Sequence, residues 1–214
     1  LPASAPGRLA LLGMRAGRLW QAGPYSNRTG KANGKIWIGS RGNYIINSMI
    51  DVHCHLNFHA FRKDFDEVIK KAHERGVKKI INVGTSIESS QRAVELAEKY
   101  EDLYAIVGIH PHHADKLKPG WDAAIEKIAK SSNKVVAIGE TGLDYYSYAS
   151  NGIVEPKLQK EVFERQIEIA NKLNLPLQIH NRQAGNDILE ILINHKSLIL
   201  NQRPPGMFHC MSGN

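Results

Sequence analysis

Apolar residues recur in two alternating patterns from Met49 onward. Short runs rich in β-branched residues predict six strands, at residues 50–55, 79–84, 104–110, 135–140, 175–180 and 207–210. Between them, apolar positions three and four residues apart predict five amphipathic helices, at residues 64–75, 88–100, 121–130, 156–173 and 186–195. This alternation is typical of a parallel sheet covered by helices, and it fits both an open doubly wound sheet and a (β/α)8 barrel.

Polar side chains at the strand ends distinguish these two folds. The carboxyl end of nearly every predicted strand carries a histidine or an acid: His53, His55, His110, Glu140, His180 and His209. In a barrel all these ends converge on one mouth, whereas an open sheet spreads them along a line. We therefore predict a (β/α)8 TIM barrel, of which this chain contains about six strands and five helices.

Charge is distributed unevenly along the 214 residues. The formal net charge is +7, but residues 1–48 hold seven cations and no acid, so the 21 acids from Met49 onward face 28 − 7 = 21 cations. The neutral part gives no electrostatic ground for nucleic-acid binding, which has to be argued from the site. We expect residues 1–48 to be a disordered or non-native leader, with a targeting segment as the alternative, and residues 49–214 to be the N-terminal part of the barrel.

The chain has no sequence signal for a membrane or for a disulfide framework. No apolar run approaches the roughly 18 residues of a membrane span. Two cysteines, Cys54 and Cys210, cannot form a disulfide framework in a chain of this length. We expect both to pack as small apolar residues. A cytoplasmic location is therefore expected, or a nuclear or organellar one if the leader is a targeting segment.

Three strand-end residues could form a metal site. His53 and His55 are two apart on a strand and point the same way, as a pair for a divalent cation or as two satisfied surface groups. Glu140 ends an apolar strand between glycines, where a carboxylate is costly unless it is paired or bound to metal. Its two oxygens can span two cations. The structural alternative is an ion pair with Arg182 or Lys134.

His180 and His209 could complete a second site. A lone histidine on an apolar strand is more often a hydrogen-bonded core residue than a ligand, but the other candidates reverse these odds. His110 could contact a substrate oxyanion, whereas His112 and His113 are expected to be solvated loop residues.

Flanking residues offer contacts to a substrate. Arg182 suits bidentate phosphate recognition or a surface salt bridge. Tyr145, Tyr146 and Tyr148 could stack on a base or simply pack their loop.

Five segments resemble, in order, the signatures of the TatD family of metal-dependent deoxyribonucleases: IDVHCHL at 50–56, GIHPH at 108–112, GETGLDYY at 139–146, LPLQIHNR at 175–182 and FHCMSG at 208–213. The resemblance covers about Met49 to the last residue. It implies a metal-dependent hydrolase barrel of the amidohydrolase-like type. It also implies divalent metal, commonly magnesium, and DNA degradation as a 3′ to 5′ exonuclease or a less selective nuclease.

The resemblance also implies roles for individual residues. His53 and His55 would bind one metal, Glu140 would bridge two metals as the catalytic carboxylate, and His180 and His209 would bind the second. His110 and Arg182 would contact phosphate or substrate. This sequence departs from the family at Thr141, where Ile is frequent, and at Asn181, where Ser or Cys is usual. It also stops before the aspartate that ends the family's eighth strand and completes the first metal site.

These interpretations lead to one expected function and two alternatives. We expect two divalent ions, magnesium before zinc or manganese, and DNA as substrate, with no membrane and no obligate protein partner. A barrel lacking two strands would leave unpaired edges, so we expect this chain alone to be unstable and to have little activity. The alternatives are a barrel hydrolase of a small amide, lactone or phosphotriester, and a non-catalytic scaffold or nucleic-acid partner.

Overall fold

The computed structural model describes residues 31–32, 35–36, 49–149, 152–200 and 205–212, so most of the predicted leader lies outside the described residues. Two short strands, β1 (Lys31–Ala32) and β2 (Lys35–Ile36), pair antiparallel within that leader. The remaining strands form one parallel sheet in chain order: β3 (Met49–Cys54), β4 (Val77–Val83), β5 (Leu103–Val107), β6 (Val135–Asp144), β7 (Leu177–Arg182) and β8 (Gly206–Ser212). All six predicted strands are therefore present, although β6 extends beyond its predicted end and β5 ends at Val107, so that His110 lies after the strand and not within it.

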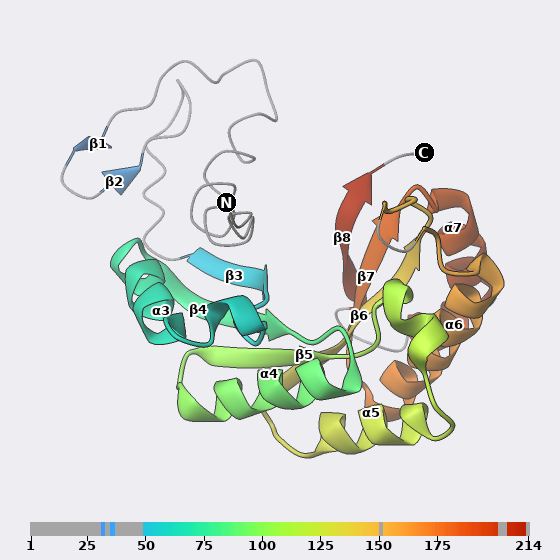
Figure 1. The fold of residues 1–214 in the computed structure, drawn as a ribbon, viewed down its shortest axis with the longest axis horizontal. Coiled ribbons are helices and arrows are strands. Elements are labelled where there is room, and N and C mark those ends of the chain that lie inside the picture. Colours follow the sequence, from blue (N-terminus) through green and yellow to red (C-terminus); the bar gives the residue numbers. More distant parts are fainter. Residues whose placement is uncertain (1–30, 33–34, 37–48, 150–151, 201–204, 213–214) are drawn as a thin grey trace.

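Helices lie on the convex side of this sheet, which curls into an open half-barrel (Figure 1). The helical elements are η2 (His59–Phe61), α3 (Phe65–Glu74), α4 (Ile87–Lys99), η3 (Pro111–Lys116), α5 (Trp121–Lys130), α6 (Pro156–Leu173), α7 (Gly185–Asn194) and α8 (Lys196–Ile199). The five predicted helices are present, and the barrel-type fold is confirmed for this part of the chain. Among the described residues, none of the helices has the length and apolar character needed to cross a bilayer.

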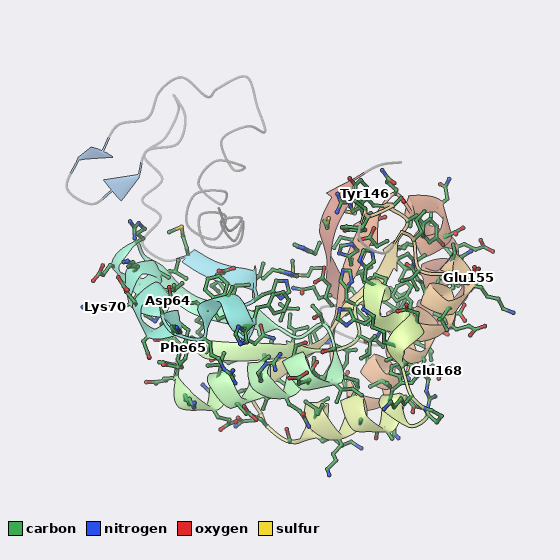
Figure 2. All side chains as sticks on the ribbon, in the orientation of Figure 1. Asp64, Phe65, Lys70, Tyr146, Glu155 and Glu168 are labelled. Atoms are coloured by element: carbon green, nitrogen blue, oxygen red, sulfur yellow. The ribbon has the colours of Figure 1, made fainter. Side chains whose placement is uncertain are left out.

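Amphipathic spacing explains how the helices attach to the sheet. In α6, Phe163 and Ile167 are fully buried against the strands, while Glu168 on the outer surface is exposed (Figure 2). The helix begins with Pro156 at its first position and ends at Asn174 in the left-handed conformation, both common boundaries. The other long helices, α3, α4, α5 and α7, also bury one apolar face. This packing fixes the helices against the sheet and so fixes the positions of the strand ends.

Contacts across the concave side show how strongly the sheet curls. Gln178 of β7 donates from Nε2 to the carbonyl of Val52 in β3, at 2.9 Å. Its Oε1 lies 2.8 Å from Nδ1 of His53. The rings of His53 and His209 stack with centroids 3.6 Å apart, which joins β3 to β8. The first strand therefore meets the last two through side chains inside the half-barrel.

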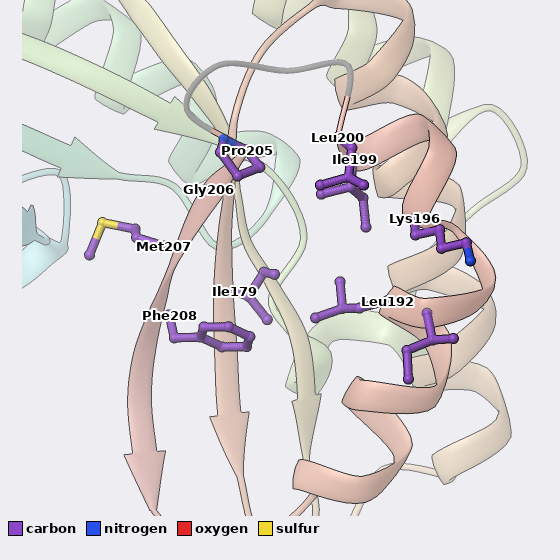
Figure 3. Close-up of a pocket in the computed structure, with 10 residues that line it drawn as sticks. Ile179, Leu192, Lys196, Ile199, Leu200, Pro205, Gly206, Met207 and Phe208 are labelled. Atoms are coloured by element: carbon purple, nitrogen blue, oxygen red, sulfur yellow. The ribbon is translucent and has the colours of Figure 1, made fainter.

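An apolar groove of about 290 Å³ lies on the opposite side of β7 and β8, against α7 and α8 (Figure 3). Ile179 and Phe208 approach it from the strands, and Leu192 and Ile199 from the helices. The Phe208 side chain remains 45% exposed. The described part of the chain thus leaves a sizeable apolar surface beside the edge strand.

The two cysteines differ in their surroundings. Cys54 is buried in the main core, which confirms its expected packing. Cys210 is only half-buried and has a left-handed backbone with φ of 54° in the edge strand.

Candidate metal centre

The strand ends gather the predicted residues around one buried carboxylate. Glu140 of β6 is 3% exposed, and its oxygens lie close to five imidazoles. The distances are 2.6 Å to His180 Nδ1, 3.5 Å to His53 Nε2, 3.7 Å to His209 Nε2, 3.8 Å to His55 Nε2 and 3.8 Å to His110 Nε2. The structure thus brings the two proposed ligand sets, His53 with His55 and His180 with His209, to the same glutamate.

The structure contradicts the alternative prediction that Glu140 forms an ion pair with Arg182 or Lys134. Arg182 instead donates from Nη1 to the hydroxyl of Tyr148 at 2.6 Å. Lys134 donates to the backbone carbonyls of Tyr100 and Glu101. Within the described ranges, the charged or polar groups near the Glu140 carboxylate are therefore the imidazoles.

Hydrogen bonds fix the tautomers of the His53 and His55 pair. Nδ1 of His53 faces the oxygen of Gln178, and Nδ1 of His55 donates to the carbonyl of Val83 at 2.9 Å. With Nδ1 donating in each ring, the two Nε2 lone pairs face one another at 3.0 Å. Two lone pairs at this distance repel unless a cation lies between them. This donor arrangement fits a divalent metal.

Burial disfavours protonation of His53, so a proton does not occupy the place of the metal ion at this ring. Burial disfavours the charged ring and, despite the nearby Glu140, lowers the pKa of His53 to about 3. The ring is therefore neutral and available as a ligand around neutral pH. Ligand atoms of His53, His55 and Glu140 all lie within 4.8 Å of one another, so these three residues could hold one metal ion.

His180 lies between two buried carboxylates. Nδ1 faces Glu140 at 2.6 Å, and Nε2 faces Oδ2 of Asp144 at 3.0 Å. Burial lowers the pKa of His180, but the hydrogen bonds and charges of Asp144 and Glu140 outweigh it and raise the pKa to about 9. For Glu140, burial raises the pKa, yet the neighbouring His180, His110 and His53 reverse this and leave its pKa well below the usual range. The carboxylate is ionised at neutral pH.

Asp144 was not identified as a site residue from the sequence. It is completely buried, accepts from the backbone N–H of Tyr146 at 3.0 Å and from the Tyr148 hydroxyl at 3.1 Å, and pairs with His180. The predicted strand ended at Glu140, but β6 continues to Asp144. The alternation Glu140–Gly142–Asp144 was a usable signal, because residues two apart on a strand share a face.

Gly142 makes this extension possible. It pairs with His180 across the two strands at a φ of 130°, and a Cβ there would lie 2.2 Å from the carbonyl oxygen of His180. Only glycine permits so close an approach in this conformation.

His110 presents a proton to the site instead of a lone pair. Its Nδ1 accepts from the backbone N–H of His112 at 3.1 Å, so the neutral ring carries its proton on Nε2, which faces Glu140. Burial lowers the pKa of His110 to about 3 despite the opposing charge of Glu140, so the ring is neutral. This geometry suits a hydrogen-bond donor to a substrate oxygen better than a metal ligand.

The expectation that His112 is a solvated loop residue is wrong. It lies in η3, its side chain is 15% exposed, and its Nε2 is 3.4 Å from Asp144 Oδ2. His113 in the same turn is half-buried, so it too departs from that expectation. The His-Pro-His segment folds back over the strand end because Pro111 starts the 3-10 helix.

Arg182 and two tyrosines border the centre. The guanidinium of Arg182 lies 3.9 Å from the ring centroid of Tyr146 and 5.2 Å from that of Tyr148. Tyr145 instead donates its hydroxyl to Asp187 at 2.6 Å, which ties the loop to α7. Only part of the predicted aromatic loop is therefore available at the site.

A curled parallel sheet that gathers imidazoles around a buried carboxylate at its carboxyl edge defines the class of metal-dependent barrel hydrolases. Within this class, the family described as TatD related DNase matches residues 50–214. The chain belongs to the TatD family, which confirms the resemblance found in its sequence.

Curated relatives and a solved structure agree with this assignment. The chain is 39% identical over 166 residues to an uncharacterized metal-dependent hydrolase, YabD, of Bacillus subtilis, a match that covers 77% of this chain and 61% of the relative. It is 34% identical over 165 residues to the 3′-5′ ssDNA/RNA exonuclease TatD of Salmonella typhimurium, covering 77% and 60%. The crystal structure of YjjV, a TatD homologue of Escherichia coli, matches with a TM-score of 0.64 at 31% identity, over 71% of this chain and 57% of that one. The chain thus spans about 60% of the length of these curated relatives.

Proposed function

We propose that this chain carries the metal centre of a deoxyribonuclease that hydrolyses phosphodiester bonds, acting as a 3′ to 5′ exonuclease through two divalent cations. The observation that carries the proposal is the position of Glu140, whose oxygens lie within 4 Å of imidazoles from both ends of the sheet. The relatives named as exonucleases support the nucleic-acid substrate. Magnesium is the first choice, with zinc or manganese as alternatives, because histidine-rich sites accept all three.

Each residue has a proposed role. His53 and His55 would hold one cation, His180 and His209 would hold the second, and Glu140 would be shared by the two. When bound, the cations supply Lewis acidity toward a phosphate and a water molecule.

The remaining groups bind and orient the substrate. His110 donates from Nε2–H to a phosphate oxygen, and Arg182 provides positive charge at the edge of the site. Asp144 accepts from Nε2–H of His180, which would leave Nδ1, beside Glu140, as the ligand atom. His209 is partly exposed, with 35% of its side chain accessible, so the candidate site is not closed on that side by the described residues.

The test combines metal binding with turnover on the whole 214-residue chain. A single-stranded oligonucleotide labelled at its 5′ end is incubated with magnesium, manganese or zinc, while calorimetry measures the metal stoichiometry. We expect two metal ions per chain and slow shortening of the DNA from its 3′ end, both lost in Glu140→Gln. Glu88→Gln, which changes an exposed glutamate paired with Arg92, serves as the matched control and should behave as wild type.

Three results would contradict the proposal. Metal binding with no shortening of DNA beyond the Glu140→Gln background would remove the nuclease assignment. Hydrolysis of small esters or amides, without hydrolysis of DNA, would show that the chain is a small-molecule hydrolase and not a nuclease. DNA affinity that survives both chelation and Glu140→Gln, without turnover, would indicate a non-catalytic partner.

A further inference from the structure

Tyr146 is an exposed aromatic residue directly beside the metal centre. Its backbone N–H donates to Oδ1 of Asp144, which fixes its position two residues beyond the carboxylate that holds His180. Tyr146 is 38% exposed, and it lies at the carboxyl end of the right-hand half of the sheet (Figure 2). An aromatic ring that only filled the loop would be expected to bury its surface.

The guanidinium that covers part of this ring is itself held in place. Arg182 lies 3.9 Å from the Tyr146 centroid and donates to the Tyr148 hydroxyl, which in turn donates to Asp144. Among the residues that the structure describes, Arg182 forms no ion pair with a carboxylate. An ordered cation without a local counter-charge, next to an exposed ring, is suited to an anion that carries an aromatic group.

We propose that Tyr146 and Arg182 form a subsite for one nucleotide, in which the base stacks on Tyr146 and its phosphate pairs with Arg182. This inference rests on the proposed function and assigns contact with the base to Tyr146. Stacking on an aromatic ring needs one exposed face of the base, which the bases of a single strand offer.

The experiment compares two ligands that differ only in their bases. A labelled single-stranded phosphorothioate oligonucleotide, which resists hydrolysis, and its fully abasic counterpart are titrated with the 214-residue chain in magnesium. The readout is fluorescence anisotropy, and the measured quantity is the ratio of the two dissociation constants. The variants are Tyr146→Leu, which removes the ring, and Tyr146→Phe, which retains it.

Tyr104→Leu is the matched control. Tyr104 also carries cationic partners on its ring, with Nζ of Lys79 and Lys134 at 5.1 and 5.0 Å, but it lies near the amino end of β5, away from the site. Far-UV circular dichroism checks that each variant is folded.

We expect the wild-type chain to bind the base-bearing strand about ten-fold or more tightly than the abasic one. Tyr146→Leu should bring the ratio close to one, while Tyr146→Phe and Tyr104→Leu should preserve it. A wild-type ratio near one, or an unchanged ratio in Tyr146→Leu, would overturn the subsite. Loss of metal-dependent turnover in the separate nuclease assay, with the ratio intact, would instead count against the proposed function alone.

Discussion

The Nε2 atoms of His53 and His55 lie 3.0 Å apart although both rings hold their proton on the opposite nitrogen. The acceptors that set these tautomers, Gln178 on β7 and the carbonyl of Val83 on β4, lie on strands that are separated by β5 and β6 in the sheet. The fold therefore orients both lone pairs before any cation arrives. Because folding already orients the two rings, metal binding does not have to supply the free energy of ordering them, and this favours tight binding.

Gln178 should thus contribute to metal affinity without touching the metal. Replacing Gln178 by Leu removes the acceptor for Nδ1–H of His53, and the ring can then rotate or change tautomer. We expect metal affinity to fall about 10- to 100-fold, the usual effect of losing such a supporting hydrogen bond. Competition with a chromophoric chelator measures this change.

Gln166→Leu provides the control for that substitution. Gln166 is equally buried, but it bonds to the backbone of Ile109 and to Thr141, not to an imidazole of the cluster. It should lower the stability of the fold while the folded fraction keeps its metal affinity. Equal losses of affinity in both variants would show that Gln178 acts only through stability.

The tautomers themselves can be observed directly. Long-range ¹⁵N–¹H spectra of the metal-free chain at neutral pH should show the proton on Nδ1 in His53 and His55 but on Nε2 in His110. The difference arises because His110 Nδ1 accepts a backbone N–H, whereas the other two Nδ1 atoms donate. A proton on Nδ1 of His110 would make that ring a metal ligand and remove its role as a donor to substrate.

Much of this centre could be predicted from residue periodicity. His53 and His55 share a strand face because they are two residues apart, and His180 and His209 occupy paired positions on adjacent strands. Once the strands are taken as parallel and curled, their carboxyl ends have to converge. The positions of these side chains therefore followed from local pattern and one assumption about topology.

The residues that support the centre were harder to find. Gln178 looks like an isolated polar residue in an apolar strand, and its partners in β3, Val52 and His53, lie more than 120 residues earlier in the sequence. His112 depends on how Pro111 turns the chain back, which no periodicity records. Asp144 lies after two glycines that normally interrupt a strand, so the strand was predicted to end too early.

The metal-free chain should have its greatest stability near pH 6.5. The pKa of His180 is raised to about 9 in the folded state, so its contribution is complete below its unfolded value near 6.5 and is lost as pH rises through 9. The pKa of His53 and of His110 is lowered to about 3, so their contribution is present above about 6.5 and is lost as pH falls toward 3. Urea unfolding in EDTA from pH 4 to 10 should change the unfolding free energy by a few kcal/mol on each side of the maximum.

Two variants separate His180 from other titrating groups. Asp144→Asn removes one of the two carboxylates that raise the pKa of His180, so the loss of stability on the alkaline side should become smaller. Asp187→Asn, which alters a carboxylate bound to Lys160 and Tyr145, should leave that slope unchanged. A wild-type profile flat between pH 6.5 and 9 would show that His180 is neutral in the metal-free chain.

The apolar groove beside β8 should make the chain associate with itself. Ile193 on α7 is 54% exposed and lines the groove together with the half-exposed Phe208. An exposed apolar surface next to an unpaired strand edge promotes association at micromolar to millimolar concentrations.

Ile193→Glu tests this association, and Asn194→Glu is its control because it adds the same charge on an exposed position of the same helix without removing apolar surface. Light scattering after gel filtration at about 100 μM should show oligomers or aggregates for the wild type and Asn194→Glu, and more monomer for Ile193→Glu. The charge alone cannot produce this difference, since both variants carry it. A wild-type chain that stays monomeric under these conditions, or an equal effect of the two substitutions, would show that the groove does not drive association.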